Sequence, residues 1–293
     1  MTEQDKESRE KLRRKFTGPN PAKIDLAHNH ILDRKLKKVG LEGRAGDSKL
    51  ASVLMRTFCV GFPDPDGIIK PFGTAFVLDI QDRQYLVTAS HVIESIYGEG
   101  IIHILQDKKW RPFEVTVVGK GDANNPETDI AVLAAKIYFP VPLALPFNPS
   151  VVNMFWGQQV YFCGFPYGFY TDIDIAEGHP VAMTKGAVLS GMHTKSGTLP
   201  ERERGLFVLD GHNNIGFSGG PAVFQLGEDR NADFQVFGVV MGYRRAKVDI
   251  KHEGKETGLT SQENTGLVLC PSIVRAIDMI EANPIGFELR TFF

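Results

Sequence analysis

The feature that most constrains the fold of this chain is a series of short β-rich runs that begins near residue 51. About twelve such runs follow one another to residue 270, and each is bounded by Gly, Pro, Asn or Asp. The first run is ASVLMRTFCVGF, at 51–62. Turns join the runs, whereas a doubly wound α/β sheet needs helices of about ten to fifteen residues between its strands. The pattern therefore predicts an all-β sandwich or barrel.

Residues 1–48 depart from this pattern, and we predict that they form a charged, partly helical N-terminal extension. Residues 1–16 have a helix-forming composition but are polar on all sides, and TGPNP at 17–21 interrupts them. The remaining residues, 49–293, are predicted to form one domain. An amphipathic helix at 271–282 ends this domain.

Composition narrows the classes of function. The chain has 293 residues, of which 42% are hydrophobic and 23% charged, and its formal net charge is −2. The basic stretch KKWR at 108–111 is too short for a nucleic-acid footprint, so we expect neither a nucleic-acid nor a membrane partner. The charged N-terminus lacks the apolar region of a secretory signal, which predicts a cytoplasmic protein.

The three cysteines are widely separated and indicate no disulfide or metal site. Cys59, Cys163 and Cys270 form no CxxC pair. This spacing argues against a disulfide framework and against a cysteine zinc site. We expect each thiol to behave as a small buried hydrophobic group.

The stretch GHNNIGFSGGPAVF, at 211–224, raises the question of whether Ser218 is a nucleophile or a polar residue in a turn. Three glycines surround it, namely Gly216, Gly219 and Gly220. Glycine is needed where a backbone takes φ > 0 or where another molecule must approach closely. The same glycines leave room for the N–H groups of Gly216 and Ser218 to converge on one point, as an oxyanion site requires.

A serine becomes a useful nucleophile only when a base removes its proton, and that base needs an orienting acid. His91 directly follows the apolar run YLVTAS, so its imidazole lies at the end of a predicted strand. Asp129, in PETDIAVLAA, stands where a second buried run begins. Taken singly, each of these residues fits a purely structural role. Together they place His, Asp and Ser, in this order, at the edges of β runs.

The stretches GTAFVL, YLVTASHVI, TDIAVL and GFSGGPAVF, followed by GVVMGY, together resemble the ordered motifs of chymotrypsin-like (trypsin-like) serine peptidases. They are most similar to the bacterial high-temperature-requirement type, and the resemblance covers about residues 51–282. It implies two antiparallel six-stranded β-barrels. His91 and Asp129 would come from the first barrel and Ser218 from the second, and they would meet in the cleft between the barrels.

The resemblance also implies roles for these residues in a serine endopeptidase. His91 would act as general base and then acid, Asp129 would hold its tautomer, and Ser218 would attack the carbonyl carbon. The N–H groups of Gly216 and Ser218 would form the oxyanion hole. Such a reaction needs a protein or peptide substrate but no cofactor and no metal.

Substrate contacts are implied in the same way. Met241, Gly242 and Tyr243 would pair with the substrate backbone as an added strand. His212 would lie near the primary specificity pocket, together with Gly242 and Tyr243. No acid stands at the expected base of this pocket, which argues against a preference for Lys or Arg, although Asp210 lies close by in the sequence.

Three positions depart from the family pattern. Phe217 precedes the serine, where digestive relatives carry an acid that pairs with a newly freed N-terminus, so this activation route is not expected here. Val92 follows His91 in place of a cysteine, and Ala75 replaces a glycine. About ten residues follow the C-terminal helix, too few for an appended peptide-binding domain, which predicts a lone peptidase with an N-terminal appendage.

Two other functions remain open at this stage. GFSGG also fits the GxSxG elbow of α/β-hydrolase esterases, but an elbow needs a following helix and a later histidine, and the only later one is His252. A pseudo-peptidase could bind peptides without cleaving them, or an effector could switch on a latent enzyme, with the N-terminal extension as the docking element for a regulatory partner. The HNH sequence at 28–30 has no cluster of acids and is read as accidental.

Overall fold

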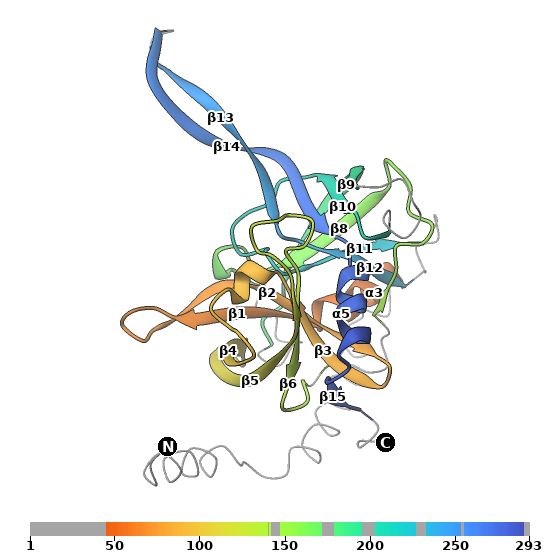
Figure 1. Cartoon of the computed structure of the whole chain (residues 1–293). Coiled ribbons are helices and arrows are strands. Elements are labelled where there is room, and N and C mark those ends of the chain that lie inside the picture. The colour runs from red at the N-terminus through yellow and green to blue at the C-terminus, as the bar shows by residue number, and fades with distance from the viewer. Residues whose placement is uncertain are drawn as a thin grey trace.

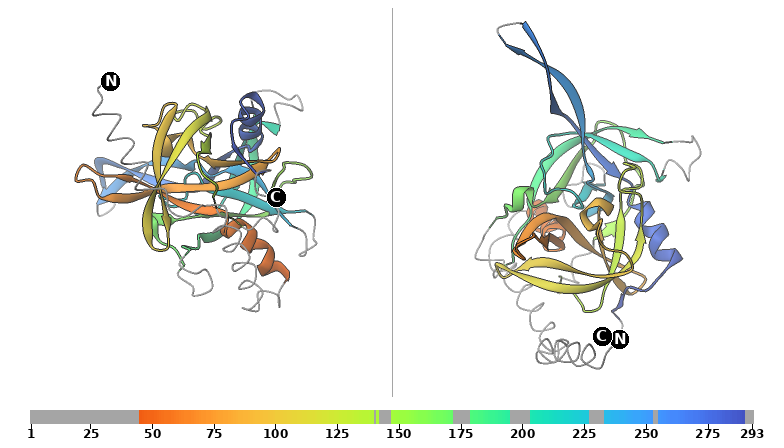
Figure 2. Two further views of the ribbon diagram at one scale, coloured as in Figure 1. Left: turned by 90° about the horizontal axis from the view of Figure 1, so that it is seen from below. Right: turned by 60° about the vertical axis from the view of Figure 1, so that its left-hand side comes forward.

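The computed structural model describes residues 45–139, 141, 147–171, 179–194, 203–226, 233–252 and 255–289. Two mainly antiparallel β-sheets dominate this part of the chain and pack against each other (Figure 1, Figure 2). The predicted all-β, chymotrypsin-like architecture is confirmed. The predicted extension at 1–48 lies outside the described residues except for 45–48, and so does the HNH sequence at 28–30.

The first described element corrects the prediction of a β run at 51–62. Residues 51–54 belong to a helix, α3 (Ala45–Leu54), and the first strand, β1, begins only at Thr57. Alanine and leucine at 50, 51 and 54 favour helix, whereas the β-branched and aromatic residues of this stretch gather from 57 onward. The Thr57 hydroxyl donates a hydrogen bond of 2.7 Å to the Val53 carbonyl and so links the end of the helix to the strand.

The first sheet is a closed barrel. Its strands pair in the order β15-β3-β2-β1-β4-β5-β6, and an additional pairing of β3 with β6 closes the six main strands on themselves. These six strands are β1 (Thr57–Pro63), β2 (Ile69–Ile80), β3 (Arg83–Thr88), β4 (Glu99–Gln106), β5 (Lys109–Lys120) and β6 (Ala131–Ala135). Closure leaves the barrel without an exposed edge among its main strands.

The second sheet has eight strands and stays open. Its order is β13-β14-β10-β9-β8-β11-β12-β7. These strands are β7 (Asn148–Pro149), β8 (Gln159–Gly164), β9 (Met183–His193), β10 (Leu206–Asp210), β11 (Pro221–Gln225), β12 (Phe234–Val239), β13 (Gly242–His252) and β14 (Lys255–Pro271). The resemblance implied six strands here, whereas the sheet has eight, and its edge strands β13 and β7 do not pair with each other. A single bridge between Gly238 and Ser272 links β12 to the end of β14.

Strands at the centre of the first sheet are buried on both faces. On β2, Ala75 and Val77 point into the barrel interior, whereas Phe76 and Leu78 join a second cluster that includes Val223 and other side chains of the second sheet. Each β-strand directs successive side chains to opposite faces. The alternation therefore lets one strand fill both its own barrel and the interface between the sheets.

The C-terminal segment ties the two sheets together. The predicted helix is confirmed as α5 (Val274–Ala282), which follows β14 of the second sheet and packs on β5 and β6 of the first. The Asn283 side chain donates a hydrogen bond of 3.1 Å to the Val118 carbonyl of β5. Beyond it, β15 (Phe287–Glu288) pairs with β3. No helix among the described residues is both long enough and apolar enough to cross a membrane.

Candidate active site

The first sheet brings together a histidine and an aspartate. His91 lies in a short 3₁₀ helix, η2 (Ser90–Ile93), which follows β3, and Asp129 lies two residues before β6. β3 and β6 are paired neighbours, so their adjoining ends meet. The Asp129 carboxylate is fully buried and accepts two hydrogen bonds from His91, at 3.0 Å from the backbone N and at 2.6 Å from Nδ1.

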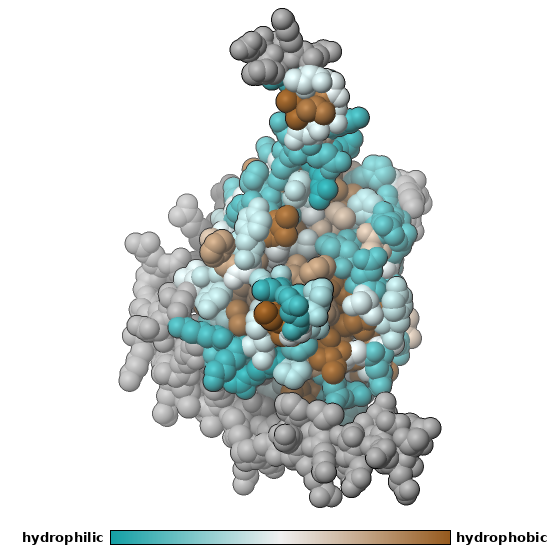
Figure 3. Space-filling view, turned by 90° about the vertical axis from the view of Figure 1, so that its left-hand side faces the viewer, coloured by the Kyte–Doolittle hydropathy of each residue, from teal (hydrophilic) through white to brown (hydrophobic). Residues whose placement is uncertain are grey.

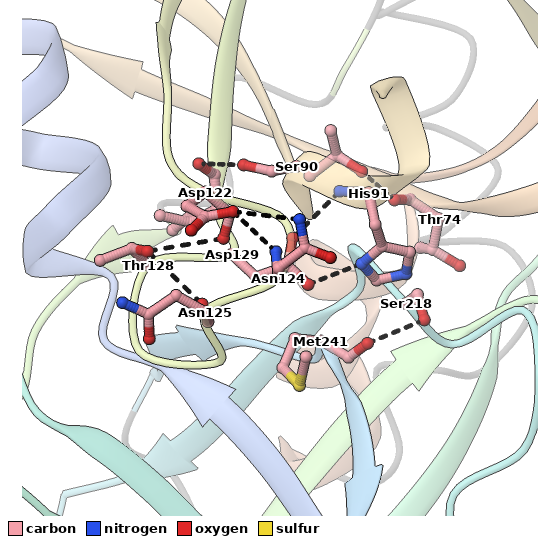
Figure 4. Close-up of polar contacts among 12 residues, drawn as sticks. Thr74, Ser90, His91, Asp122, Asn124, Asn125, Thr128, Asp129, Ser218 and Met241 are labelled. Carbon is pink, nitrogen blue, oxygen red and sulfur yellow. Dashed lines mark hydrogen bonds and ion pairs between the residues drawn. The ribbon is translucent and has the colours of Figure 1, made fainter. Parts of the chain in front are cut away.

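Two contacts to one carboxylate fix both the position and the orientation of the imidazole. The backbone bond locates the residue, and the ring bond leaves Nε2 on the far side, turned away from the aspartate. Figure 4 shows the ring of His91 between Asp129 and Ser218. A third of the His91 side chain is exposed, so solvent or a substrate can reach the ring.

Ser218 lies in a turn of the second sheet, just before β11. Its hydroxyl donates a hydrogen bond of 3.1 Å to the Met241 carbonyl oxygen (Figure 4). Among these described residues no hydrogen bond joins Ser218 to His91. Hydrogen bonds at catalytic sites are often long or misaligned without substrate, so rotation of the serine side chain toward Nε2 would complete the arrangement.

Two glycines give this turn its shape. Gly216 has φ +103 and Gly219 has φ +87, which is left-handed backbone that other residues rarely adopt. A Cβ at Gly216 would lie 2.3 Å from the Phe165 carbonyl oxygen, and one at Gly219 would lie 1.9 Å from the Thr74 carbonyl oxygen. Ser218 therefore lies in a glycine turn, as the sequence suggested, and the same glycines allow close packing around the serine.

The N–H group of Gly216 has a defined direction. The Ile215 carbonyl accepts a hydrogen bond of 2.8 Å from the Tyr167 backbone N–H. In a trans peptide the C=O and N–H point in opposite directions, so the Gly216 N–H points away from Tyr167. Within the described part of the chain, neither this N–H nor that of Ser218 donates a hydrogen bond. Both stay available for an anionic oxygen.

Thr74 of β2 attaches the serine turn to the first sheet, a role that the sequence did not reveal. It is fully buried, and its backbone N–H donates to the Ser218 carbonyl at 2.7 Å. Its hydroxyl donates to the Gly216 carbonyl at 2.7 Å and accepts from the Phe165 N–H at 3.1 Å. Thr74 therefore holds the backbone on both sides of Phe217, with its hydroxyl on Gly216 and its backbone N–H on Ser218.

Phe217 and Lys185 hold the same turn from the second sheet. The Phe217 side chain is fully buried and packs edge-on against Phe162, with ring centroids 5.0 Å apart. Lys185 donates to the His212 carbonyl at 2.8 Å and to the Asn214 side-chain oxygen at 2.5 Å. Burial lowers the pKa of this lysine. The turn is thus anchored by packing and by a half-buried lysine, without the acid that digestive relatives carry before the serine.

The residues predicted to bind substrate differ in how they are placed relative to Ser218. The Met241 carbonyl contacts the Ser218 hydroxyl, and Gly242 and Tyr243 follow as the first residues of β13. Nothing lies within 4 Å of the place where a Cβ on Gly242 would be, so the backbone is accessible there. His212 is exposed, and its carbonyl is held by Lys185. Asp210, at the end of β10, is also exposed.

The packing around the site shows where two departures from the family pattern lie and decides one alternative function. Val92 and Ala75 are buried in the interior of the first barrel. The segment after Ser218 is a strand, β11, and not the helix that an α/β-hydrolase elbow requires, so the esterase alternative is wrong. No group of three or more His, Cys, Asp or Glu side chains in the described ranges is placed to hold a metal ion.

A family model for the trypsin-like peptidase domain matches residues 73–228, which is more than half of the chain. The chain belongs to the trypsin-like peptidases. The family suggested by the sequence motifs is thereby confirmed, and the chain is a serine protease.

Several solved protease structures are similar to this chain in fold. The active form of the Rv3671c protease from M. tuberculosis has a TM-score of 0.50 and 19% identity, over 83% of this chain and 86% of that one. Its inactive form has a TM-score of 0.47 and 19% identity, over 84% and 95%. The HtrA-type protease AlgW with a decapeptide has a TM-score of 0.49 and 14% identity, over 82% and 66%. No curated protein matches this trypsin-like peptidase in sequence.

Proposed function

We propose that this trypsin-like peptidase is an endopeptidase that cleaves peptide bonds through a His91–Asp129–Ser218 triad and an acyl-enzyme intermediate. The observation that carries the proposal is the position of His91, which is bonded twice to a fully buried carboxylate while its ring faces Ser218 (Figure 4). A buried carboxylate acts on the imidazole in a medium of low dielectric, where its effect on the imidazolium is strongest.

The proposed reaction begins with rotation of the Ser218 hydroxyl from the Met241 carbonyl to His91 Nε2. Nε2 takes the hydroxyl proton as Oγ bonds to the substrate carbonyl carbon, and Asp129 stabilises the imidazolium that results. The imidazolium then gives its proton to the leaving amine as the peptide C–N bond breaks. A water molecule, deprotonated by the same histidine, attacks the ester and releases Ser218.

The negative charge of the tetrahedral intermediate requires donors that are already in place. We assign this role to the N–H groups of Gly216 and Ser218, whose turn is held from both sheets by Thr74, Phe217 and Lys185. Donors fixed before the reaction need no reorganisation when the charge develops, which makes them effective.

Labelling with a fluorophosphonate probe tests the proposal. The probe reacts with a serine hydroxyl that a neighbouring base has activated. We expect one modified peptide, which contains Ser218, and loss of labelling in the His91→Ala and Asp129→Asn variants. Labelling that is unchanged in the His91→Ala variant, or modification of a different serine, would rule out the triad.

The orientation of Ser218 also supports a second candidate function, a latent enzyme that an effector switches on. In the structure the hydroxyl is bonded to Met241 and not to His91. If this arrangement persists in solution, the wild-type protein will label with the probe much more slowly than it does once a partner engages the N-terminal extension. A rate of labelling that is the same for the full chain and for a chain lacking residues 1–44 would argue against this gating.

A further inference from the structure

The longest strand that the structure describes, β14, forms with β13 a hairpin that leaves the body of the second sheet. β13 and β14 pair from Gly242 with Leu269 out to His252 with Lys255. Figure 1 and Figure 2 show the hairpin projecting well beyond both sheets. The sequence analysis did not predict this hairpin.

The hairpin is continuous with the active site. β13 begins at Gly242, one residue after the Met241 carbonyl that binds the Ser218 hydroxyl. It is also the terminal strand of its sheet, so one edge pairs with β14 and the other has no neighbouring strand within the described part of the chain. An open edge presents alternate N–H and C=O groups that another extended chain can pair with.

The free edge is much longer than the three residues expected to bind substrate. β13 has 11 residues. At roughly 3.3 Å per residue it offers about 35 Å of open backbone, enough for about ten residues of an added strand. A chain that pairs antiparallel with β13 and ends at Ser218 runs toward the serine from its own N-terminal side. This edge therefore suits the segment that precedes the cleaved bond.

The charge of β13 suggests which segments it prefers. It carries four basic side chains, Arg244, Arg245, Lys247 and Lys251, and one acidic one, Asp249, in a chain whose net charge is −2. All four basic residues are exposed. Arg245 lies over the ring of Tyr243 and bonds to Gln262, whereas Arg244 and Lys247 form no ion pair with any side chain that the structure describes. Lys251 lies opposite Glu256 of β14 in the strand register. Figure 3 shows a mainly hydrophilic hairpin with a small hydrophobic patch near its end.

We propose that the free edge of β13 beyond Tyr243, from Arg244 to His252, extends the substrate-binding edge and binds residues far before the cleaved bond as an added antiparallel strand. Its basic side chains select acidic residues in that segment. This inference rests on the proposed endopeptidase function and adds to it a preference for long, acidic and extended substrates. A second copy of the chain fits this edge less well, because two β13 strands side by side would bring like charges together.

Cleavage profiling with a library of peptides derived from a whole proteome tests this preference. The wild type should cleave peptides with acidic residues from about the fourth to the tenth position before the cut. In the Arg244→Ser/Lys247→Ser variant this preference should be lost. Its kcat/KM should fall about five- to ten-fold for long acidic peptides, as loss of two surface charge contacts predicts, and stay within about two-fold for peptides with three residues before the cut.

The Lys70→Ser/Lys109→Ser variant is the matched control, because it removes the same charge from exposed positions on the first sheet. It should keep the acidic preference of the wild type. Cleavage that continues with no acidic preference, or with one only after the cut, would overturn the proposal while leaving the endopeptidase function intact.

A binding measurement separates the two proposals. A fluorescein-labelled peptide of alternating Glu and Thr, about as long as β13, should bind to the Ser218→Ala protein, and more weakly to the same protein with the two hairpin substitutions. A Lys–Thr peptide should not bind. If the Glu–Thr peptide binds through the hairpin but the wild-type protein cleaves no substrate, the result would contradict the endopeptidase function and support the proposed binding edge of β13. Equal binding of both peptides, or none, would count against the surface, and so would a hairpin-dependent dimer in solution.

Discussion

The first sheet holds His91 and Asp129 by contacts between side chains and backbone within one closed barrel, whereas the second sheet holds Ser218 through the backbone of a glycine turn. The carboxylate of Asp129 is fully buried and makes two short contacts to one histidine. The serine turn instead depends on two positive φ angles and on contacts that come from both sheets. The proposed base is thus fixed by its own barrel, while the proposed nucleophile is fixed by the neighbours of its turn.

This difference predicts how substitutions in each sheet would impair activity. Substitution on the histidine side removes a chemical group but leaves a closed barrel whose main strands have no free edge. Substitution around Ser218 leaves every reacting group present but lets the turn move, so that the N–H groups no longer point at one place. Errors of about 1 Å in such positions are enough to slow a reaction severely.

The largest effects are expected from the reacting groups themselves. Ser218→Ala and His91→Ala should each lower kcat by about four to six orders of magnitude, and the double variant should lose little more, because the groups act as a unit. Asp129→Asn should lower kcat by about three to four orders of magnitude, since it leaves the imidazole in the wrong tautomer. Steady-state assays on an unstructured protein substrate, with circular dichroism to check folding, provide the measurement.

His193→Ala is the control for these variants. His193 is largely exposed and bonds to Glu127 at 3.0 Å, two residues from Asp129. Glu127 is buried, but His193 itself is largely exposed and contacts none of the proposed triad residues, so activity should stay within about three-fold of wild type. Most of the activity surviving in Ser218→Ala or His91→Ala would show that the two sheets do not supply one catalytic unit.

The next largest effect should come from the shape of the serine turn. Gly216→Ala places a Cβ 2.3 Å from the Phe165 carbonyl oxygen and strains a backbone at φ +103. The turn must shift, and loss of one aligned oxyanion donor costs about two to three orders of magnitude in kcat. Gly258→Ala is the matched control, because it strains a similar φ of +73 with no neighbour within 4 Å. This control should leave kcat on short peptides unchanged, and an equal loss in both variants would contradict the role of Gly216.

A smaller loss is expected where the two sheets meet at Thr74. Thr74→Val keeps the shape of the side chain but removes the hydroxyl, so the Gly216 carbonyl and the Phe165 N–H both lose a buried partner. We expect kcat to fall about ten- to a hundred-fold with KM nearly constant, since the substrate strand does not contact Thr74. Thr74→Ser retains the hydroxyl and should restore most of the activity. If Val and Ser behave alike, the hydroxyl does not position the turn.

The sequence predicted the three proposed triad residues but not the contacts that hold the serine turn. His91, Asp129 and Ser218 stood at the edges of β runs, and the local pattern placed them at strand ends as the structure has them. Thr74 lies within the quoted run GTAFVL, but its three partners are about 90 to 140 residues away along the chain. No local periodicity encodes such contacts, because they arise only when two sheets pack.

The errors in the fold have similar causes. Residues 51–54 were read as strand because an apolar run next to a β run cannot be distinguished from a short buried helix by periodicity alone. The β13–β14 hairpin was missed because its polar residues resembled a loop. Ala246, Val248 and Ile250 alternate with charged residues there, and this period of two was the available signal.

The cysteines offer the smallest effect and compare the sheets directly, because Cys59 lies on β1 of the closed barrel while Cys163 and Cys270 lie on the open second sheet. Burial raises the pKa of the Cys59 and Cys163 thiols to about 12 and that of Cys270 still further. All three thus stay protonated at pH 9 in the folded protein, although an unfolded thiol titrates near 8.5.

Iodoacetamide at pH 9 should leave the native protein unlabelled. With rising urea, mass spectrometry should find Cys163 and Cys270 labelled before Cys59, because a closed barrel has no edge strand from which to open. Simultaneous labelling would mean that the sheets unfold as one unit, and labelling in the native state would show that the thiols are accessible.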